Sequence, residues 1–354
     1  MSRWFSAKYS ALTPYTPGEQ PKDRSYIKLN TNESPFPPSE AVVRAAEKEA
    51  RSLELYSDPE SVVLRRALAE AYGVDFNETI VTNGSDEVLN FAFMAFCDEK
   101  RPAIFPDITY GFYPVFAALN GVPFREIPLR DDFTIDPEDY IRSEGTVFLA
   151  NPNAPTGIAL PLCMIERIVA ADPDRVVVVD EAYVDFGGES AVRLIPQYEN
   201  LLVVRTFSKS RSLAGARLGF GLAQASLIAD LHTIRYSTNP YNVNRMTEAA
   251  GAASLAEDEL NHAHVEIIKN TRERTAKALA GLSFELTPSC ANFLFARHPS
   301  IPGEELYRKL KQRGILVRHF SLPRIADYNR ITVGSAEEMD ALVAAVRELV
   351  EETK

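Results

Sequence analysis

Residues of types used in covalent and acid–base chemistry follow two short apolar runs of this sequence. Residues 176–179 are all valine, and Asp180 and, three residues later, Tyr183 come after them. Residues 201–204 form a second run, which Lys209 follows closely. A lysine amine can form a Schiff base with a carbonyl group, whereas a carboxylate beside a buried strand is costly unless it has a partner. Because functional residues gather at the carboxyl ends of strands in open α/β sheets, we expect these side chains to meet.

A second set of residues is suited to binding an anion. Ser85 and Asp86 come after an expected strand at residues 79–82 and begin an expected helix. The first backbone N–H groups of a helix can hold a phosphate. Ser208 offers a hydroxyl and Arg217 a guanidinium, which pairs well with phosphate oxygens. These four residues therefore predict a phosphate cradle.

Each of these signals is weak alone, but together they meet the needs of pyridoxal 5'-phosphate (PLP). This cofactor needs an amine, an anion beside its pyridine nitrogen, a donor to its phenolic oxygen, a phosphate cradle and an aromatic ring for stacking. We assign the amine to Lys209, the anion to Asp180 and the donor to Tyr183. The phosphate cradle is assigned to Ser85, Asp86, Ser208 and Arg217, and the stacking ring to Tyr110. Lys209, Asp180 and Tyr183 form the expected catalytic set. The histidines are scattered and the three cysteines lack CxxC spacing, so we expect no metal site.

The elements that must position these residues alternate between strands and helices. We expect strands buried on both faces at residues 146–150, 176–179 and 201–204, and a helix at 161–171. This alternation is typical of an α/β fold with a mainly parallel sheet flanked by helices. A long helical stretch is expected at about residues 247–282. From residue 284 on, the pattern predicts a smaller α+β domain with strands at 292–296 and 330–333 and helices at 303–313 and 336–351.

The N-terminal part of the chain reads differently. Six prolines within residues 1–38 exclude a regular helix there and indicate an extended arm. Ser39 is expected to cap a first helix, and a second one is expected at residues 61–72, ended by Gly73. We predict three parts: an arm (1–30), a large PLP-binding domain (57–269) and a small domain formed by 31–56 with 270–354.

Composition narrows the class of protein. The chain has 354 residues and a net charge of −11, a balance that argues against a nucleic-acid binder but leaves room for a small anionic substrate. Neither a signal peptide nor an apolar run of membrane-spanning length is apparent. Three widely spaced cysteines do not form a disulfide framework. We therefore expect a cytoplasmic protein with no membrane partner.

The segment at residues 206–219, which includes Lys209 and Arg217, resembles the PLP-lysine motif of fold-type I aminotransferases. The order of residues 84–87, 151–157 and 180–183 before it is similar to that family along most of the chain. This resemblance implies a large PLP-binding domain and a smaller α+β domain. It also implies amino-group transfer, in which Lys209 moves a proton and 2-oxoglutarate and glutamate form the second substrate pair.

Four further segments resemble the histidinol-phosphate aminotransferase subgroup: residues 29–35, 180–186, 240–244 and 330–334. That resemblance implies histidinol phosphate as the amino donor. It implies that Tyr15, Tyr56, Arg318 and Arg330 contact the substrate or the cofactor phosphate. Tyr56 would do so from the neighbouring subunit of a homodimer with shared active sites.

The substrate stays open at this point, because arginine pairs with a carboxylate as well as with a phosphate. An aromatic amino-acid aminotransferase would use the same machinery. A related PLP decarboxylase acting on threonine phosphate is a third possibility. A binding protein that kept the fold without chemistry would need neither Lys209 nor Asp180, so we expect an enzyme.

One position departs from the family pattern. Aminotransferases of this kind usually have an asparagine directly before Pro-Thr-Gly, and it donates a hydrogen bond to the phenolic oxygen of the cofactor. This chain has Ala154 there. The donor is missing unless Asn151, Asn153 or a water replaces it, or Tyr183 holds the oxygen alone.

Overall fold

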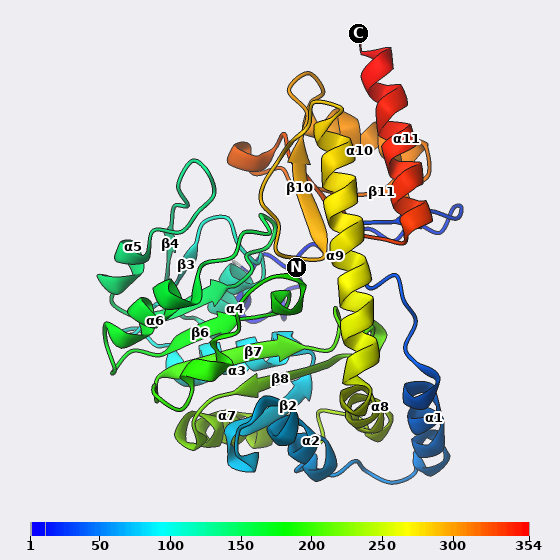
Figure 1. Cartoon of the computed structure of the whole chain (residues 1–354). Coiled ribbons are helices and arrows are strands. Elements are labelled where there is room, and N and C mark those ends of the chain that lie inside the picture. The colour runs from blue at the N-terminus through cyan, green and yellow to red at the C-terminus, as the bar shows by residue number, and fades with distance from the viewer. Residues whose placement is uncertain (1, 11, 354) are drawn as a thin grey trace.

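A seven-stranded sheet forms the centre of the molecule, seen here in a computed structural model that describes residues 2–10 and 12–353 (Figure 1). The strand order is β2-β8-β7-β6-β5-β3-β4. Strand β8 runs antiparallel to both of its neighbours, and the other pairs are parallel. The strands are β2 (Thr79–Asn83), β3 (Ala103–Pro106), β4 (Phe124–Ile127), β5 (Thr146–Ala150), β6 (Val177–Asp180), β7 (Leu201–Thr206) and β8 (Leu218–Leu222). The expected α/β class with a mainly parallel sheet is confirmed.

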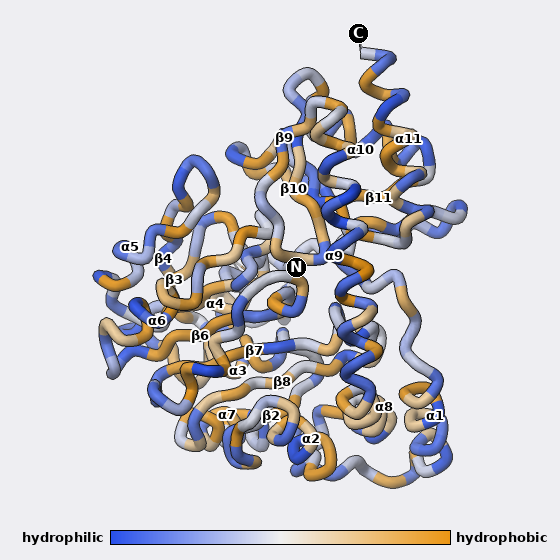
Figure 2. The backbone as a smooth tube through the Cα atoms, in the orientation of Figure 1, coloured by the Kyte–Doolittle hydropathy of each residue, from blue (hydrophilic) through white to orange (hydrophobic). Residues whose placement is uncertain are grey.

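The strands at the centre of this sheet are buried on both faces. Every residue of β5, β6 and β7 is buried, and alternate side chains enter two separate cores. One core holds Val177 and Val179 with α2 (Val62–Tyr72), α6 (Leu162–Ala170) and α8 (Arg245–Ala256). The other holds Val178 with α3 (Ser85–Phe96), α4 (Tyr113–Asn120) and α7 (Ala225–Thr238). Two helical layers therefore enclose the sheet, and its apolar strands stand out between them in Figure 2.

The C-terminal part of the chain builds a second, smaller sheet. Its four strands are antiparallel in the order β12-β13-β10-β9, and β1 pairs with β11 beside them. The strands are β1 (Ile27–Lys28), β9 (Glu285–Leu286), β10 (Phe293–Arg297), β11 (Ile315–Leu316), β12 (Arg318–His319) and β13 (Asn329–Thr332). Helices α10 (Gly303–Gln312) and α11 (Ala336–Glu352) pack against it around a third core. The upper part of Figure 1 shows this α+β unit.

The long helical stretch expected at about residues 247–282 consists of two helices. Helix α8 ends at Ala256, and α9 (Asp258–Ala280) begins after Glu257, whose φ of −109° and ψ of 40° are not helical. The side-chain amide of Asn261 donates to the carbonyls of Ser254 and Glu257 and so satisfies acceptors at the break. The break lets α8 pack across α1 (Glu40–Glu49) while α9 runs up to the small sheet (Figure 1).

The first two helices begin and end much as predicted. The side chain of Ser39 accepts a hydrogen bond from the backbone of Val42 and caps α1 (Glu40–Glu49). Helix α2 ends at Gly73, which has a φ of 64°. A short helix α5 (Pro137–Ile141) completes the set of α-helices.

The three-part division of the chain stays a prediction. Helix α1, which it assigns to the small domain, packs against α8 beside the large sheet. Residues 1, 11 and 354, which fall in the predicted arm and small domain, lie outside the described residues.

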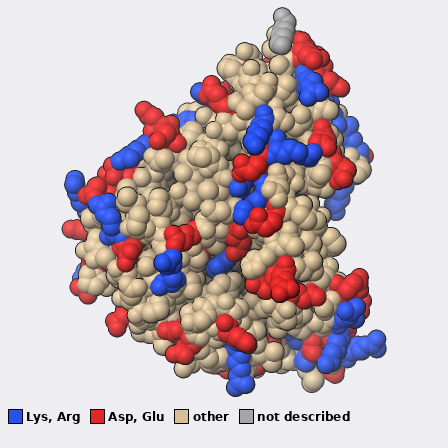
Figure 3. Space-filling model, in the orientation of Figure 1, with Lys and Arg blue, Asp and Glu red and all other residues tan. Residues whose placement is uncertain are grey.

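Acidic and basic side chains are interspersed over the face drawn in Figure 3. In the described part of the chain, no helix has both the length and the apolar character needed to cross a membrane.

Candidate active site

A cavity of about 430 Å³ lies where the carboxyl ends of the large-sheet strands meet the N-terminal arm and the small sheet. All but one of the residues assigned from the sequence line it: Tyr15, Ser85, Asp86, Tyr110, Asp180, Tyr183, Ser208, Lys209, Arg217, Arg318 and Arg330. The exception is Tyr56. Residues that were grouped from the sequence therefore lie together in one cavity of the fold.

Asp180 is the last residue of β6 and is 6% exposed. Burial raises the pKa of its carboxyl group to about 7, although hydrogen bonds from the Tyr113 hydroxyl (3.1 Å) and the Ala182 backbone (3.2 Å) favour the ionised form. Nearby Asp86 and Glu181 also raise this pKa. Among the described residues, no basic side chain lies within ion-pair distance of this carboxylate, and a protonated ring nitrogen would supply a cation.

Lys209 lies in the loop after β7, opposite Tyr183. Its Nζ donates to the backbone carbonyl of Thr31 at 3.2 Å and lies 5.8 Å from the centre of the Tyr183 ring. Within the described ranges, no carboxylate lies at ion-pair distance from this amine. The Nζ atom therefore faces the cavity without a counter-ion, as a Schiff-base lysine requires.

The four residues expected to form a phosphate cradle lie together at the start of α3 and line the cavity. Gly84 has a φ of 80°, and a Cβ atom there would lie 2.4 Å from Nη2 of Arg217, so the close approach of the guanidinium requires glycine. That guanidinium contacts the Asp86 carboxylate at 3.2 Å. The backbone N–H groups of Ser85 and Asp86 lack intrahelical acceptors by their position in the first turn. Ser208 lines the same cavity.

Aromatic side chains close one side of the cavity. The Tyr110 hydroxyl donates to Oδ1 of Asp86 at 2.7 Å, and its ring lies edge-on to that of Tyr113. Tyr15, from the arm, stacks on Phe112 with ring centres 4.2 Å apart. A flat ring held between the strand ends and these tyrosines would be shielded from water.

Two arginines approach the cavity from the small sheet. Arg330 of β13 donates through Nη2 to the carbonyl of Asn30 at 3.1 Å, while its Nε is buried without a hydrogen-bond partner. Burial lowers the pKa of this guanidinium. Arg318 of β12 donates to the carbonyls of Thr16 (2.9 Å) and Pro17 (3.1 Å) in the arm. In residues 2–10 and 12–353, neither arginine pairs with a carboxylate. The pair is therefore suited to an anionic ligand.

Two residues that contact this site from outside the cavity were not found from the sequence. Tyr113, in α4, was not singled out, because its contact with Asp180 joins positions 67 residues apart. Arg205, at 7% side-chain exposure, contacts Glu181 at 3.8 Å and also pairs with Asp185. Asp185 in turn accepts from Ser210 at 2.5 Å. This cluster joins the loop that bears Tyr183 to the loop that bears Lys209. The cluster could have been predicted from Arg205, because an arginine within an apolar strand needs a buried partner.

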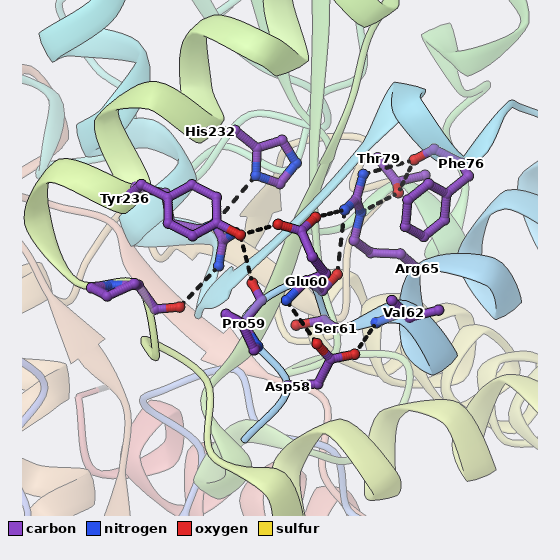
Figure 4. Close-up of polar contacts among 12 residues, drawn as sticks. Asp58, Pro59, Glu60, Ser61, Val62, Arg65, Phe76, Thr79, His232 and Tyr236 are labelled. Carbon is purple, nitrogen blue, oxygen red and sulfur yellow. Dashed lines mark hydrogen bonds and ion pairs between the residues drawn. The ribbon is translucent and has the colours of Figure 1, made fainter. Parts of the chain in front are cut away.

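Tyr56 lies outside this cavity. Its side chain is 80% exposed and stacks on Tyr241 with ring centres 4.5 Å apart. The segment after it is firmly anchored (Figure 4). Asp58 accepts hydrogen bonds from two backbone N–H groups, Arg65 contacts the Glu60 carboxylate at 2.9 Å, and the Tyr236 hydroxyl donates to Glu60 as well. Tyr56 thus projects outward from a fixed base.

The cavity has the residue types of a cofactor site. Over the described residues, no group of three or more histidine, cysteine, aspartate or glutamate side chains is placed to hold a metal ion. The cavity offers an amine, a buried carboxylate and a cradle in which a Cβ atom at Gly84 would occupy the space taken by Arg217. These groups fit the cofactor expected from the sequence.

Comparison with known proteins gives concordant relatives over nearly the whole chain. The family model "Aminotransferase class I and II" matches residues 24–346. Histidinol-phosphate aminotransferase 2 of Dechloromonas aromatica is 50% identical over 355 residues, covering 99% of each chain. Histidinol-phosphate aminotransferase of Aromatoleum aromaticum is 49% identical, covering 99% of this chain and all of that relative. The crystal structure of histidinol-phosphate aminotransferase from Sinorhizobium meliloti in complex with pyridoxal-5'-phosphate has a TM-score of 0.90 at 25% identity, and the match covers 100% of this chain and 99% of that one.

Proposed function

This chain belongs to the class I and II aminotransferase family, and from that premise we propose that it transfers the amino group of L-histidinol phosphate to 2-oxoglutarate with PLP as cofactor. The reaction would be a step of histidine biosynthesis in the cytoplasm. The observation that carries the substrate assignment is Arg330, a cavity arginine with a buried, unpartnered Nε and no carboxylate at ion-pair distance in the described chain. The names of the relatives at about half identity support the same substrate.

The residues that would hold PLP are those of the strand ends. Lys209 would bind its carbonyl carbon, Asp180 its ring nitrogen, and Ser85, Asp86, Ser208 and Arg217 its phosphate. When bound, PLP supplies an electron sink for the carbon that carries the amino group. The buried carboxylate of Asp180 would keep the ring nitrogen protonated, which that sink requires.

The remaining work is proton transfer, for which Lys209 is the candidate. Its Nζ donates to a backbone carbonyl, and no carboxylate of the described residues lies within ion-pair distance of it. It would take the proton from the amino-bearing carbon of the donor and deliver it to a second carbon, on the side of the cofactor. Tyr15 and Tyr110 would exclude water, which would otherwise compete for that proton.

Arg330 and Arg318 would bind the phosphate of the amino donor and the distal carboxylate of 2-oxoglutarate. Arg318 already donates to the arm carbonyls of Thr16 and Pro17. Binding an anion there would therefore link substrate, arm and small sheet.

We further propose a homodimer with shared active sites. The 80% exposure of Tyr56, beside an anchored segment, supports a role for this side chain in a neighbouring subunit. An isologous pair would bring Tyr56 of each subunit to the cofactor phosphate of the other.

A substrate comparison tests this proposal. Histidinol phosphate should react with a kcat/KM at least about a hundredfold above that of histidinol, since two charge-assisted contacts are lost with the phosphate. Arg330→Met should lower the value for histidinol phosphate and leave that for histidinol nearly unchanged. Arg297→Met is a matched control, because Arg297 lies on the adjacent strand β10 and pairs with Glu285 on the surface.

The aromatic lining of Tyr15 and Tyr110, whose ring centres lie 6.4 Å apart, favours a second candidate, an aromatic amino-acid aminotransferase. If phenylalanine or tyrosine exceeds histidinol phosphate in kcat/KM, that assignment replaces the first. Release of carbon dioxide from threonine phosphate would instead identify a decarboxylase.

A further inference from the structure

Ala154 leaves the cavity without a hydrogen-bond donor at a position where the family usually has one. Its methyl group is buried and packs with Tyr183 and Phe293. A methyl group cannot donate to the phenolic oxygen of a cofactor. Another group must supply this hydrogen bond, or the oxygen does without it.

The two neighbouring asparagines are already engaged elsewhere. The side chain of Asn151 donates to the carbonyl of Leu160 at 3.2 Å and accepts from its N–H at 2.7 Å. Asn153 donates to Ile108 and to Thr156, both at 3.0 Å, and accepts from Thr109 at 2.8 Å. Both amides therefore hold the loop together, and neither residue is among those that line the cavity.

Tyr183 does line the cavity, and its hydroxyl is held by Asn32. Nδ2 of Asn32 lies 3.0 Å from the Tyr183 oxygen. Asn32 is 1% exposed, has a left-handed backbone with a φ of 56°, and its carbonyl accepts from Asn292 at 3.0 Å. Its backbone N–H donates to the hydroxyl oxygen of Thr332 at 2.9 Å. The residue is thus fixed between the arm and the small sheet.

The hydrogen bonds also fix which way the Asn32 amide points. The Thr332 hydroxyl, having accepted from the Asn32 backbone, donates its own proton to Oδ1 of Asn32 at 3.0 Å. Nδ2 must then face Tyr183 and donate to it. The reverse orientation would leave the Thr332 proton without an acceptor in the described surroundings. Because the Tyr183 oxygen accepts from Asn32, its single proton is free to point elsewhere.

We propose that Asn32 is a positioning residue that turns the Tyr183 O–H proton into the cavity, so that Tyr183 is the donor that remains where Ala154 offers none. The inference rests on the proposed function for the identity of the acceptor, the phenolic oxygen of PLP. Thr332, Asn32 and Tyr183 form a relay from the small sheet to the cofactor site. Adding an asparagine at position 154 would supply a second donor to the same oxygen.

The test uses the pH titration of the visible absorbance band of the bound cofactor, which needs no turnover. A donor to the phenolic oxygen favours the deprotonated form, so its loss should raise the titration midpoint by about one pH unit. Asn32→Asp keeps the shape but accepts from both Thr332 and Tyr183, and so turns the tyrosine proton away. Tyr183→Phe should raise the midpoint as much, and the double variant should rise no further. A larger rise in the double variant would mean that the new charge acts alone, which overturns the relay.

Three further variants tighten the assignment. Thr332→Val should raise the midpoint by releasing the Asn32 amide, whereas Thr332→Ser keeps the hydroxyl and should match the wild type. Ala154→Asn should lower the midpoint in the wild type and return it towards normal in Asn32→Asp. Should Asn32→Asp lose its native circular dichroism, the two Thr332 variants decide the matter without altering Asn32.

Two failures are distinguishable. A wild-type protein that develops no visible band with PLP contradicts the proposed function itself. A normal wild-type band with midpoints unmoved in both Asn32→Asp and Thr332→Val contradicts the relay alone.

Discussion

At the scale of single residues, the site contains a carboxylate whose burial lowers the stability of the empty protein. The pKa of Asp180 is raised from its ordinary value to about 7, so the native state binds its proton more tightly than the unfolded chain does. Stability therefore falls as the pH rises from the unfolded pKa towards 7, and the cost is fully present above that value. A cationic ligand would offset this cost by pairing with the carboxylate.

The buried charge of Asp180 predicts that Asp180→Asn lowers activity but stabilises the cofactor-free protein. Turnover should fall by at least about two orders of magnitude, because the charge opposite the ring nitrogen is lost. The cofactor-free variant should be more stable than the wild type at pH 8, by on the order of 2 kcal/mol, and the gain should shrink at pH 5.5. Urea unfolding at both pH values measures it. Near-normal turnover, or a gain independent of pH, would contradict the role of Asp180.

Asp180 and Lys209 could be predicted from the sequence, because each follows an apolar run and lies in a motif. Tyr113 and the role of Asn32 could not be predicted, because their partners lie 67 and 151 residues away. Tyr113 lies among apolar residues of α4, where a buried tyrosine gives no sign of which group its hydroxyl meets. Contacts between distant elements are set by packing, and one sequence holds no direct record of them.

At the scale of elements, the loops after β6 and β7 are joined by the buried cluster around Arg205. Glu181 has no exposed side-chain surface, and burial raises its pKa to about 6 although Arg205 opposes this. Ser190 and the Ala191 backbone donate to the same carboxylate at 2.6 Å. The cluster therefore fixes the separation of the loops that bear Tyr183 and Lys209.

Removing the cation from this cluster should be costly. Arg205→Met leaves Glu181 buried with no positive partner and should lower the free energy of unfolding by about 3 kcal/mol at pH 8. The loss should be smaller at pH 5.5, because a protonated carboxyl group no longer needs the arginine. Arg193→Met is the control, since Arg193 and Glu189 are both largely exposed and should change stability by less than about 1 kcal/mol. Equal losses in the two variants would exclude a structural role for the buried cluster.

The elements themselves were largely predictable. Residues 146–150 form β5 as expected, because an uninterrupted apolar run suits a strand covered on both faces. The helical stretch expected at about residues 247–282 consists of two helices, and the break at Glu257 was not predicted, because helical propensity alone does not reveal it.

At the scale of the whole molecule, the site is assembled from the arm, the strand ends of the large sheet and the small sheet. Tyr56 stands outside that assembly in its own subunit. If the dimer is shared as proposed, Tyr56→Ala and Lys209→Ala subunits should each be nearly inactive yet complement one another. A hybrid dimer has one site that receives both groups, so random exchange should restore about a quarter of wild-type activity. Proven subunit exchange without recovery would exclude a shared site, and Lys209→Ala mixed with itself is the control.

The central claim is that Lys209 is the residue that holds PLP, and borohydride reduction followed by peptide mapping tests it most directly. Trypsin cuts after Arg205 and Arg211 but not after a modified lysine, so the cofactor mass should appear on the peptide of residues 206–211. Lys209→Ala, still folded, should take up none. Cofactor mass on another lysine of the wild type, or on none, would contradict the account.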